Sequence, residues 1–142
     1  MRIGAGASAQ LAEVLAELGL KRPLLVSDAF MEQCGYVGKI VDGLEHAKVA
    51  HGVFAKCVPD PTTDSIASAL ACWQQGNYDS VVALGGGSSI DTAKALAVLA
   101  VHGGKMRDYK APNPVPVGVP IVAIPTTAGT GSEATRVTVI TD

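Results

Sequence analysis

Residues 80–89 read SVVALGGGSS, an apolar run that passes through three glycines into two serines. The apolar part is typical of a central parallel strand, which is buried on both faces. A helix is predicted directly after the turn, from Ser89 to about Val101. Glycine has no Cβ, so the backbone of such a turn can approach a ligand closely, and the amides that begin a helix favour an anion. The stretch therefore predicts a strand–turn–helix unit that binds a phosphate or pyrophosphate.

The same turn has a simpler interpretation, as a tight connection between a strand and a helix without a ligand. In that interpretation Ser88 caps the helix and forms a capping box with Asp91. The Ser88 hydroxyl can equally bind a phosphate oxygen, so this segment alone leaves both interpretations open. Asp91 is expected to cap the helix or to organise neighbouring groups, and not to act as a catalytic acid.

Strands and helices alternate on both sides of this unit. The other predicted strands are Pro23–Ser27, Lys48–Ala55, Val119–Ile124 and Thr135–Thr141. The other predicted helices run from after Ser8 to Leu18, from Phe30 to Leu44 with interruptions at Gly35 and Gly38, and from Thr63 to Gln75. Alternation of this kind, with continuous apolar strands, predicts an α/β fold with a largely parallel sheet and helices on both faces.

Two further strand ends carry polar residues, where parallel sheets bind ligands. Asp28 follows the first strand, and its carboxylate either accepts hydrogen bonds from an adenosine ribose or caps the next helix. In the ribose role it favours NAD, because it repels the 2′-phosphate of NADP. Residues 125–132, PTTAGTGS, place four hydroxyl side chains after another strand. This loop either surrounds a polar ligand with neutral hydrogen-bonding groups or is an ordinary connection.

Composition excludes several classes of function. Charged residues are only 17 % of the chain and the net charge is −2, which argues against a nucleic-acid surface. No apolar run approaches the length of a membrane span. The three cysteines form no CxxC pair, which favours a reducing cytoplasm. The low fraction of charged residues is also compatible with a surface that is partly covered by something outside the chain.

Taken together, the motifs resemble the iron-containing (group III) alcohol dehydrogenases. The resemblance is carried by GGGSSIDTAK at residues 85–94 and IPTTAGTGSE at residues 124–133. The stretches LVSD at residues 25–28 and VPDPT at residues 58–62 agree with the same family. It extends over essentially all of residues 1–142 and implies the family's N-terminal NAD(P)-binding domain, a Rossmann-like sheet of the dehydroquinate synthase type.

The resemblance also implies the cofactor and its site. The cofactor is NAD, with NADP less favoured, bound along the strand ends. Gly86, Gly87 and Ser88 lie at the pyrophosphate, Asp28 at the adenosine ribose and Asp60 near the adenine side. Asp91 organises the site. The residues that line the cofactor cleft are Thr126, Thr127, Thr130 and Thr135.

The reaction implied is hydride transfer between an alcohol or aldehyde and the nicotinamide, with Fe²⁺ or another divalent metal as Lewis acid. In that family one Asp and three His from a C-terminal helical domain hold the metal. His46, His51 and His102 match none of these ligands. We therefore expect a truncated chain that lacks the helical domain, supplies the cofactor half and has no turnover by itself. It should contain no metal ligand and no catalytic residue, and the resemblance leaves a homo-oligomer open.

Two alternatives remain at this point. The chain fits the equivalent half of a glycerol dehydrogenase or dehydroquinate synthase relative, although TTAGTGSE at residues 126–133 favours the alcohol dehydrogenase branch. A non-redox module that binds a phosphosugar or nucleotide would also use the glycine-rich turn. Only a dinucleotide needs the acid at Asp28 as well.

Overall fold

The structure, a computed structural model, describes residues 11–58, 62–103 and 118–125. Its sheet has the strands β1 (Pro23–Asp28), β2 (Gly52–Cys57), β3 (Ser80–Gly85) and β4 (Ile121–Pro125). The helices are α1 (Leu11–Glu17), α2 (Ala29–Gln33), α3 (Tyr36–His46), α4 (Thr63–Gln74) and α5 (Gly87–His102). The strand order is β2–β1–β3–β4 and all three pairings are parallel, so the predicted α/β class is confirmed.

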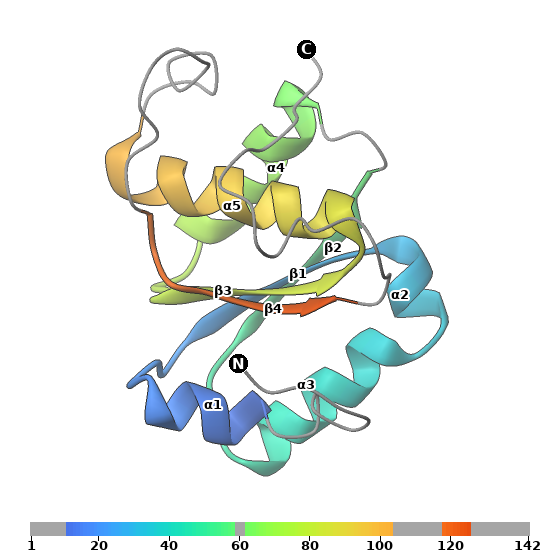
Figure 1. The fold of residues 1–142 in the computed structure, drawn as a ribbon, viewed down its shortest axis with the longest axis vertical. Coiled ribbons are helices and arrows are strands. Elements are labelled where there is room, and N and C mark those ends of the chain that lie inside the picture. Colours follow the sequence, from blue (N-terminus) through green and yellow to red (C-terminus); the bar gives the residue numbers. More distant parts are fainter. Residues whose placement is uncertain (1–10, 59–61, 104–117, 126–142) are drawn as a thin grey trace.

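Helices cover both faces of the sheet, with α4 and α5 on one face and α1 and α3 on the other (Figure 1). Successive side chains of a strand point to opposite faces, and β3 shows the consequence. Val81 and Ala83 pack in one core cluster with residues of α4 and α5, whereas Val82 and Leu84 pack in another with residues of α1 and α3. Burial on both faces is why the strands read as continuous apolar runs.

The order of the strands creates a topological switch point at one end of the sheet. The chain passes from β1 to β2 on one side and then returns to β3 on the other side of β1. Connections therefore leave the carboxyl ends of β1 and β3 in opposite directions, which is where open α/β sheets bind ligands. The Ser27 hydroxyl donates to the Leu84 carbonyl at 2.7 Å and joins these two strand ends. Asp28 and Gly85, the next residue in each strand, consequently lie at this switch point.

Two predicted elements differ from the structure. Residues 30–44 form parts of two helices, which are separated at Gly35, where φ is 86°. Gly38 lies inside α3 and does not interrupt it. The strand predicted from Lys48 begins only at Gly52, because Lys48 has φ 60° and its amide donates to the Glu45 carbonyl in the turn that ends α3.

The start of α4 follows from a capping box. Thr62 accepts from the Ser65 amide at 3.1 Å, and the Ser65 hydroxyl oxygen accepts from the Thr62 amide at 3.0 Å. The predicted start at Thr63 is confirmed by this pair of hydrogen bonds. None of the helices within the described ranges is long and apolar enough to cross a membrane. The predicted cap at Ser8 and the predicted strand over residues 135–141 lie outside those ranges.

Candidate functional site

The glycine-rich turn joins β3 to α5 without a side-chain cap. Gly85 has φ 140°, a conformation that side chains rarely adopt, and Gly86 is the extended N-cap residue of α5. Gly86 has no side chain to cap the helix, and Ser88 lies inside its first turn. The predicted capping by Ser88, or by Ser88 and Asp91 together, is therefore wrong. Helix-start amides that lack a side-chain cap favour an anion, which supports the ligand-binding interpretation of the turn.

Asp28 lies at the switch point, as the last residue of β1. It is the N-cap of α2, and its Oδ1 accepts from the Met31 amide at 2.8 Å, so the predicted capping role is confirmed. Its other oxygen faces Gly85: a Cβ placed on Gly85 would stand 3.5 Å from Asp28 Oδ2. The helix cap thus fixes one oxygen of a half-buried carboxylate and leaves the other beside the glycine-rich turn.

A small polar cluster is buried beneath the turn, formed by Ser89 and Thr92 of α5 and Cys57 at the end of β2. Burial raises the pKa of Cys57 to about 11, and the Asp28 carboxylate adds to the increase. The hydroxyls of Thr92 and Ser89 act in the opposite direction and lower the pKa. The Thr92 hydroxyl donates to the Ser88 carbonyl at 2.8 Å. Ser89 Oγ lies near enough to the Cys57 thiol to influence its pKa. It nevertheless forms no hydrogen bond with any described residue.

Asp91 follows the turn on α5 and is half-buried. Burial raises the pKa of its carboxyl, and Lys94 acts in the opposite direction. Its Oδ1 is buried and has no hydrogen-bond partner within the described parts of the chain. A buried acceptor of this kind needs a donor from elsewhere. This is compatible with the predicted organising role, which stays a prediction.

Half of the predicted site lies outside the described residues: Asp60, Thr126, Thr127, Thr130 and Thr135. The last residue of β4, Pro125, pairs with Gly85 in the sheet. The chain therefore leaves β4 at the same edge of the sheet as the glycine-rich turn.

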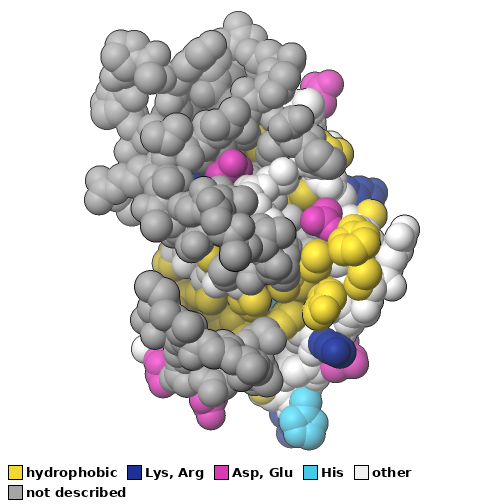
Figure 2. Space-filling view, turned by 45° about the vertical axis from the view of Figure 1, so that its right-hand side comes forward, with side chains coloured by type: hydrophobic (Ala, Val, Ile, Leu, Met, Phe, Trp, Pro, Cys, Tyr) yellow, Lys and Arg dark blue, Asp and Glu magenta, His cyan; other side chains and the backbone are white. Residues whose placement is uncertain are grey.

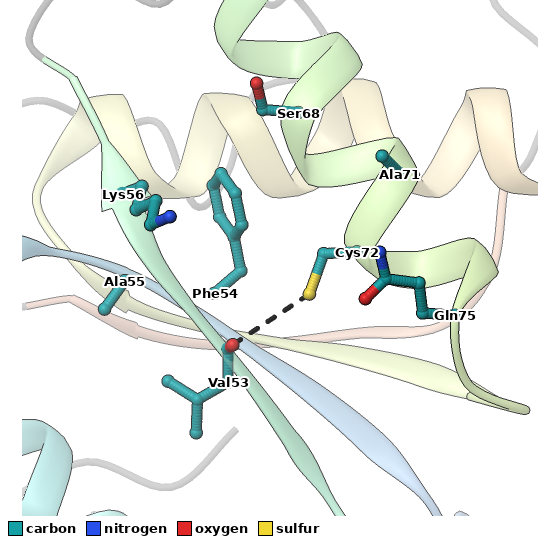
Figure 3. Close-up of a pocket in the computed structure, with 8 residues that line it drawn as sticks. All are labelled: Val53, Phe54, Ala55, Lys56, Ser68, Ala71, Cys72 and Gln75. Carbon is teal, nitrogen blue, oxygen red and sulfur yellow. Dashed lines mark hydrogen bonds between the residues drawn. The ribbon is translucent and has the colours of Figure 1, made fainter.

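A separate hollow of about 320 Å³ lies between β2 and α4 (Figure 3). Phe54 and Lys56 point to one side of β2, while Val53 and Ala55 point to the other. On the α4 side, the Cys72 thiol approaches the Val53 carbonyl at 3.9 Å. Neither Asp28 nor the glycine-rich turn lines this hollow, so it is not part of the candidate site.

Hydrophobic side chains gather on the face shown in Figure 2, beside acidic and basic ones. Among the large exposed hydrophobic residues, Phe30 of α2 is 65 % exposed and lies two residues after Asp28. Tyr36, at the start of α3, is about half exposed, and Lys39 lies over its ring. An apolar surface therefore adjoins the end of β1.

The profile of iron-containing alcohol dehydrogenases matches residues 1–142. The chain belongs to the iron-containing alcohol dehydrogenase family. It is 42 % identical over 142 residues to the NAD-dependent methanol dehydrogenase of Bacillus methanolicus, an alignment that covers 99 % of this chain and 37 % of that protein. It is 36 % identical over 142 residues to the lactaldehyde reductase of Escherichia coli K12, covering 98 % of this chain and 37 % of that protein.

A solved structure extends the comparison to the fold. The sulfoacetaldehyde reductase of Bifidobacterium kashiwanohense, solved in complex with NAD⁺, superposes with a TM-score of 0.89 at 30 % identity. The match covers 99 % of this chain and 38 % of that one. The predicted family and the Rossmann-like fold class are both confirmed. The chain spans a little over a third of the length of the curated relatives named above.

The metal of the iron-containing alcohol dehydrogenases does not fit the described part of this chain. No group of three or more His, Cys, Asp or Glu side chains there could hold a metal ion. His51 Nδ1 lies 2.9 Å from the Val49 carbonyl, and His46 and His102 are exposed near the ends of separate helices. The prediction that the chain holds no metal ligand stays a prediction.

Sequence reasoning missed the cluster of Cys57, Ser89 and Thr92. Cys57 falls opposite Asp28 only because the pairing of β1 with β2 shifts register after Val26. In the sequence Ser89 marks only the start of a predicted helix, whereas the structure shows that its hydroxyl is buried. The only sequence signal was helical spacing, since Ser89 and Thr92 are three residues apart and share one helix face.

We expect alkaline pH to destabilise the folded chain through Cys57. The thiol titrates near its ordinary value of 9.0 when unfolded and at about 11 when folded. The folded state holds the proton more tightly, so this stabilisation is complete below pH 9 and is lost as the pH rises through about 11. The loss is about 2–3 kcal/mol, at 1.36 kcal/mol per pKa unit.

Urea denaturation at several values of pH measures this loss. Cys57→Ala should flatten the decrease in stability between pH 9 and 11, whereas Cys34→Ala, at an exposed thiol, should not. An equally steep decrease in the Cys57→Ala variant would contradict the assignment to Cys57.

Proposed function

We propose that the chain is the cofactor-binding part of an NAD-linked alcohol dehydrogenase, which transfers a hydride between an alcohol or aldehyde and nicotinamide. The observation that carries the proposal is the glycine-rich turn, whose helix N-terminus lies beside an available carboxylate oxygen of Asp28. Both lie at the switch point between β1 and β3, where dinucleotides bind in doubly wound sheets. The NAD⁺ complex of the sulfoacetaldehyde reductase and the NAD-dependent methanol dehydrogenase support it.

The described residues fit the adenosine and pyrophosphate parts of such a cofactor. The amides of Gly87 and Ser88, with Gly86 before them, bind the pyrophosphate. Asp28 Oδ2 accepts from the ribose hydroxyls while Oδ1 keeps its hydrogen bond to the Met31 amide. The remaining residues of the proposed cleft are Asp60 near the adenine and Thr126, Thr127, Thr130 and Thr135 along its wall.

The bound cofactor supplies hydride chemistry, and this chain's residues bind and orient it. We assign no step to Fe²⁺ or another metal, because the described residues do not provide its ligands. A small alcohol or aldehyde substrate and a cytoplasmic location belong to the same proposal. Turnover is expected only with residues beyond the described ones.

The role of Asp28 predicts a loss of cofactor preference in Asp28→Asn. An asparagine can still cap α2, so the fold should hold, but the charge that accepts from the ribose is removed. A hydrogen bond to a charged group contributes about 1.5–3 kcal/mol, so NADH should bind about 10- to 100-fold more weakly. NADPH should bind no more weakly than before, because the carboxylate that repels its 2′-phosphate is gone.

Calorimetric titration of both nucleotides measures the ratio of their dissociation constants. Asp42→Asn, at an exposed acid of α3, makes the same charge change away from the strand ends. It should leave the ratio as it is. An unchanged preference for NADH in Asp28→Asn would refute the role of Asp28.

A further inference from the structure

The Ser89 hydroxyl is a buried polar group without a hydrogen bond. Ser89 is 1 % exposed, and its Oγ has no partner within the described residues. Buried hydroxyls are nearly always paired, so an unpaired one in a ligand-binding region calls for a role. The nearby hydroxyl of Thr92 is already used by the Ser88 carbonyl.

Ser89 Oγ and Asp28 Oδ2 flank the same small space beside Gly85. A Cβ on Gly85 would stand 2.7 Å from the former oxygen and 3.5 Å from the latter. This space is free because residue 85 is glycine. The remaining polar neighbour of the Ser89 hydroxyl is the Cys57 thiol, whose sulfur is a weak hydrogen-bond acceptor.

We propose that Ser89 is a positioning residue for the cofactor, whose hydroxyl donates to Asp28 Oδ2 in the bound state. The inference rests on the proposed NAD-binding function. An ionised carboxylate is a much better acceptor than a thiol, and rotation about the Ser89 Cα–Cβ bond moves the hydroxyl without moving α5. The Met31 amide then holds one oxygen of Asp28 and Ser89 holds the other. A carboxylate has about four acceptor positions, so some remain for the ribose hydroxyls.

Ser89 acts through Asp28 and not on the ligand, because its hydroxyl is buried behind the turn. In the bound state the hydrogen bond from Ser89 holds the Asp28 carboxylate in the orientation in which it accepts from the ribose hydroxyls. The benefit should therefore appear only for a ligand that hydrogen-bonds to the ionised Asp28. NADH is such a ligand. NADPH is not, because the ionised Asp28 repels its 2′-phosphate.

The test is a double-mutant cycle on the 142-residue chain with Ser89→Ala and Asp28→Asn, read by calorimetric titration with NADH and NADPH. Ser89→Ala removes a buried hydroxyl that has no partner, so it should fold as the unsubstituted chain does. We expect it to bind NADH about 3- to 10-fold more weakly and NADPH within about twofold, as for one lost hydrogen bond. In the Asp28→Asn background, Ser89→Ala should not change the affinity for NADH. The control Thr92→Val removes a buried hydroxyl of the same helix and should leave the NADH-to-NADPH ratio unchanged.

The possible results separate this inference from the proposed function. Equal losses for NADH and NADPH, or an equal loss in the Asp28→Asn background, would mean a general structural role and overturn the inference. The same holds if Ser89→Ala binds NADH as tightly as the unsubstituted chain. If the unsubstituted chain binds neither nucleotide, the proposed function itself fails and the inference falls with it.

Discussion

Gly86→Asp is expected to weaken NADH binding by at least about 100-fold while leaving the chain folded. Gly86 is the N-cap of α5 with φ −86°, an ordinary conformation for any residue, and aspartate is among the preferred N-cap residues. Its carboxylate would lie where we place the pyrophosphate. Two like charges about 4 Å apart repel by about 4 kcal/mol at the effective dielectric constant of a protein surface, which corresponds to about 1,000-fold in affinity before relaxation.

The matched control is Gly86→Asn, which has the same size and also caps helices but carries no charge. It should bind NADH more weakly than the unsubstituted chain and much more tightly than Gly86→Asp. Urea denaturation of all three proteins checks that the helix forms. Equal affinities in the aspartate and asparagine variants would mean that no anion binds at this turn.

Gly85→Ala should lower the free energy of unfolding by about 2–6 kcal/mol. At φ 140° an alanine is strained, which costs about 1–3 kcal/mol. Its Cβ would also stand 2.7 Å from Ser89 Oγ and 3.1 Å from Ser89 Cβ, and such overpacking costs about 1–3 kcal/mol more. The turn must shift to relieve both effects, so NADH affinity should fall as well.

Gly38→Ala is the control for this prediction. Gly38 lies inside α3, where a Cβ would meet nothing within 4 Å. Alanine there should stabilise the chain by up to about 1 kcal/mol. The two variants should therefore shift the midpoint of urea denaturation in opposite directions. A midpoint for Gly85→Ala equal to that of the unsubstituted chain would contradict the strain described at the turn.

The strands could be predicted because a strand that is buried on both faces consists mainly of apolar residues. Residues 81–84 are apolar at both odd and even positions, and only a strand covered on both faces needs that pattern. The start of β2 could not be predicted in the same way. Lys48–Ala50 have β-forming neighbours, but the hydrogen bonds that end α3 take up the amides of Lys48 and Val49.

The candidate site was predictable only in part. Asp28 and the glycine-rich turn were found because ligands bind where parallel strands end. The supposed cap at Ser88 failed because capping depends on the backbone at Gly86, which places Ser88 inside the helix. The position of Ser89 beside Asp28 depends on how α5 sits over β1 and β3, which is a tertiary contact with no local signal.

Titration with NADH tests most directly whether this chain binds a nicotinamide dinucleotide at the switch point between β1 and β3, as we propose. The nucleotide is added to the 142-residue chain and binding is followed by calorimetry and by nicotinamide fluorescence. We predict saturable binding at a single site, tighter than for NADPH and displaced by ADP-ribose, which carries the adenosine and pyrophosphate groups. Binding of a phosphosugar with no response to NADH would contradict the claim and identify a non-redox module instead.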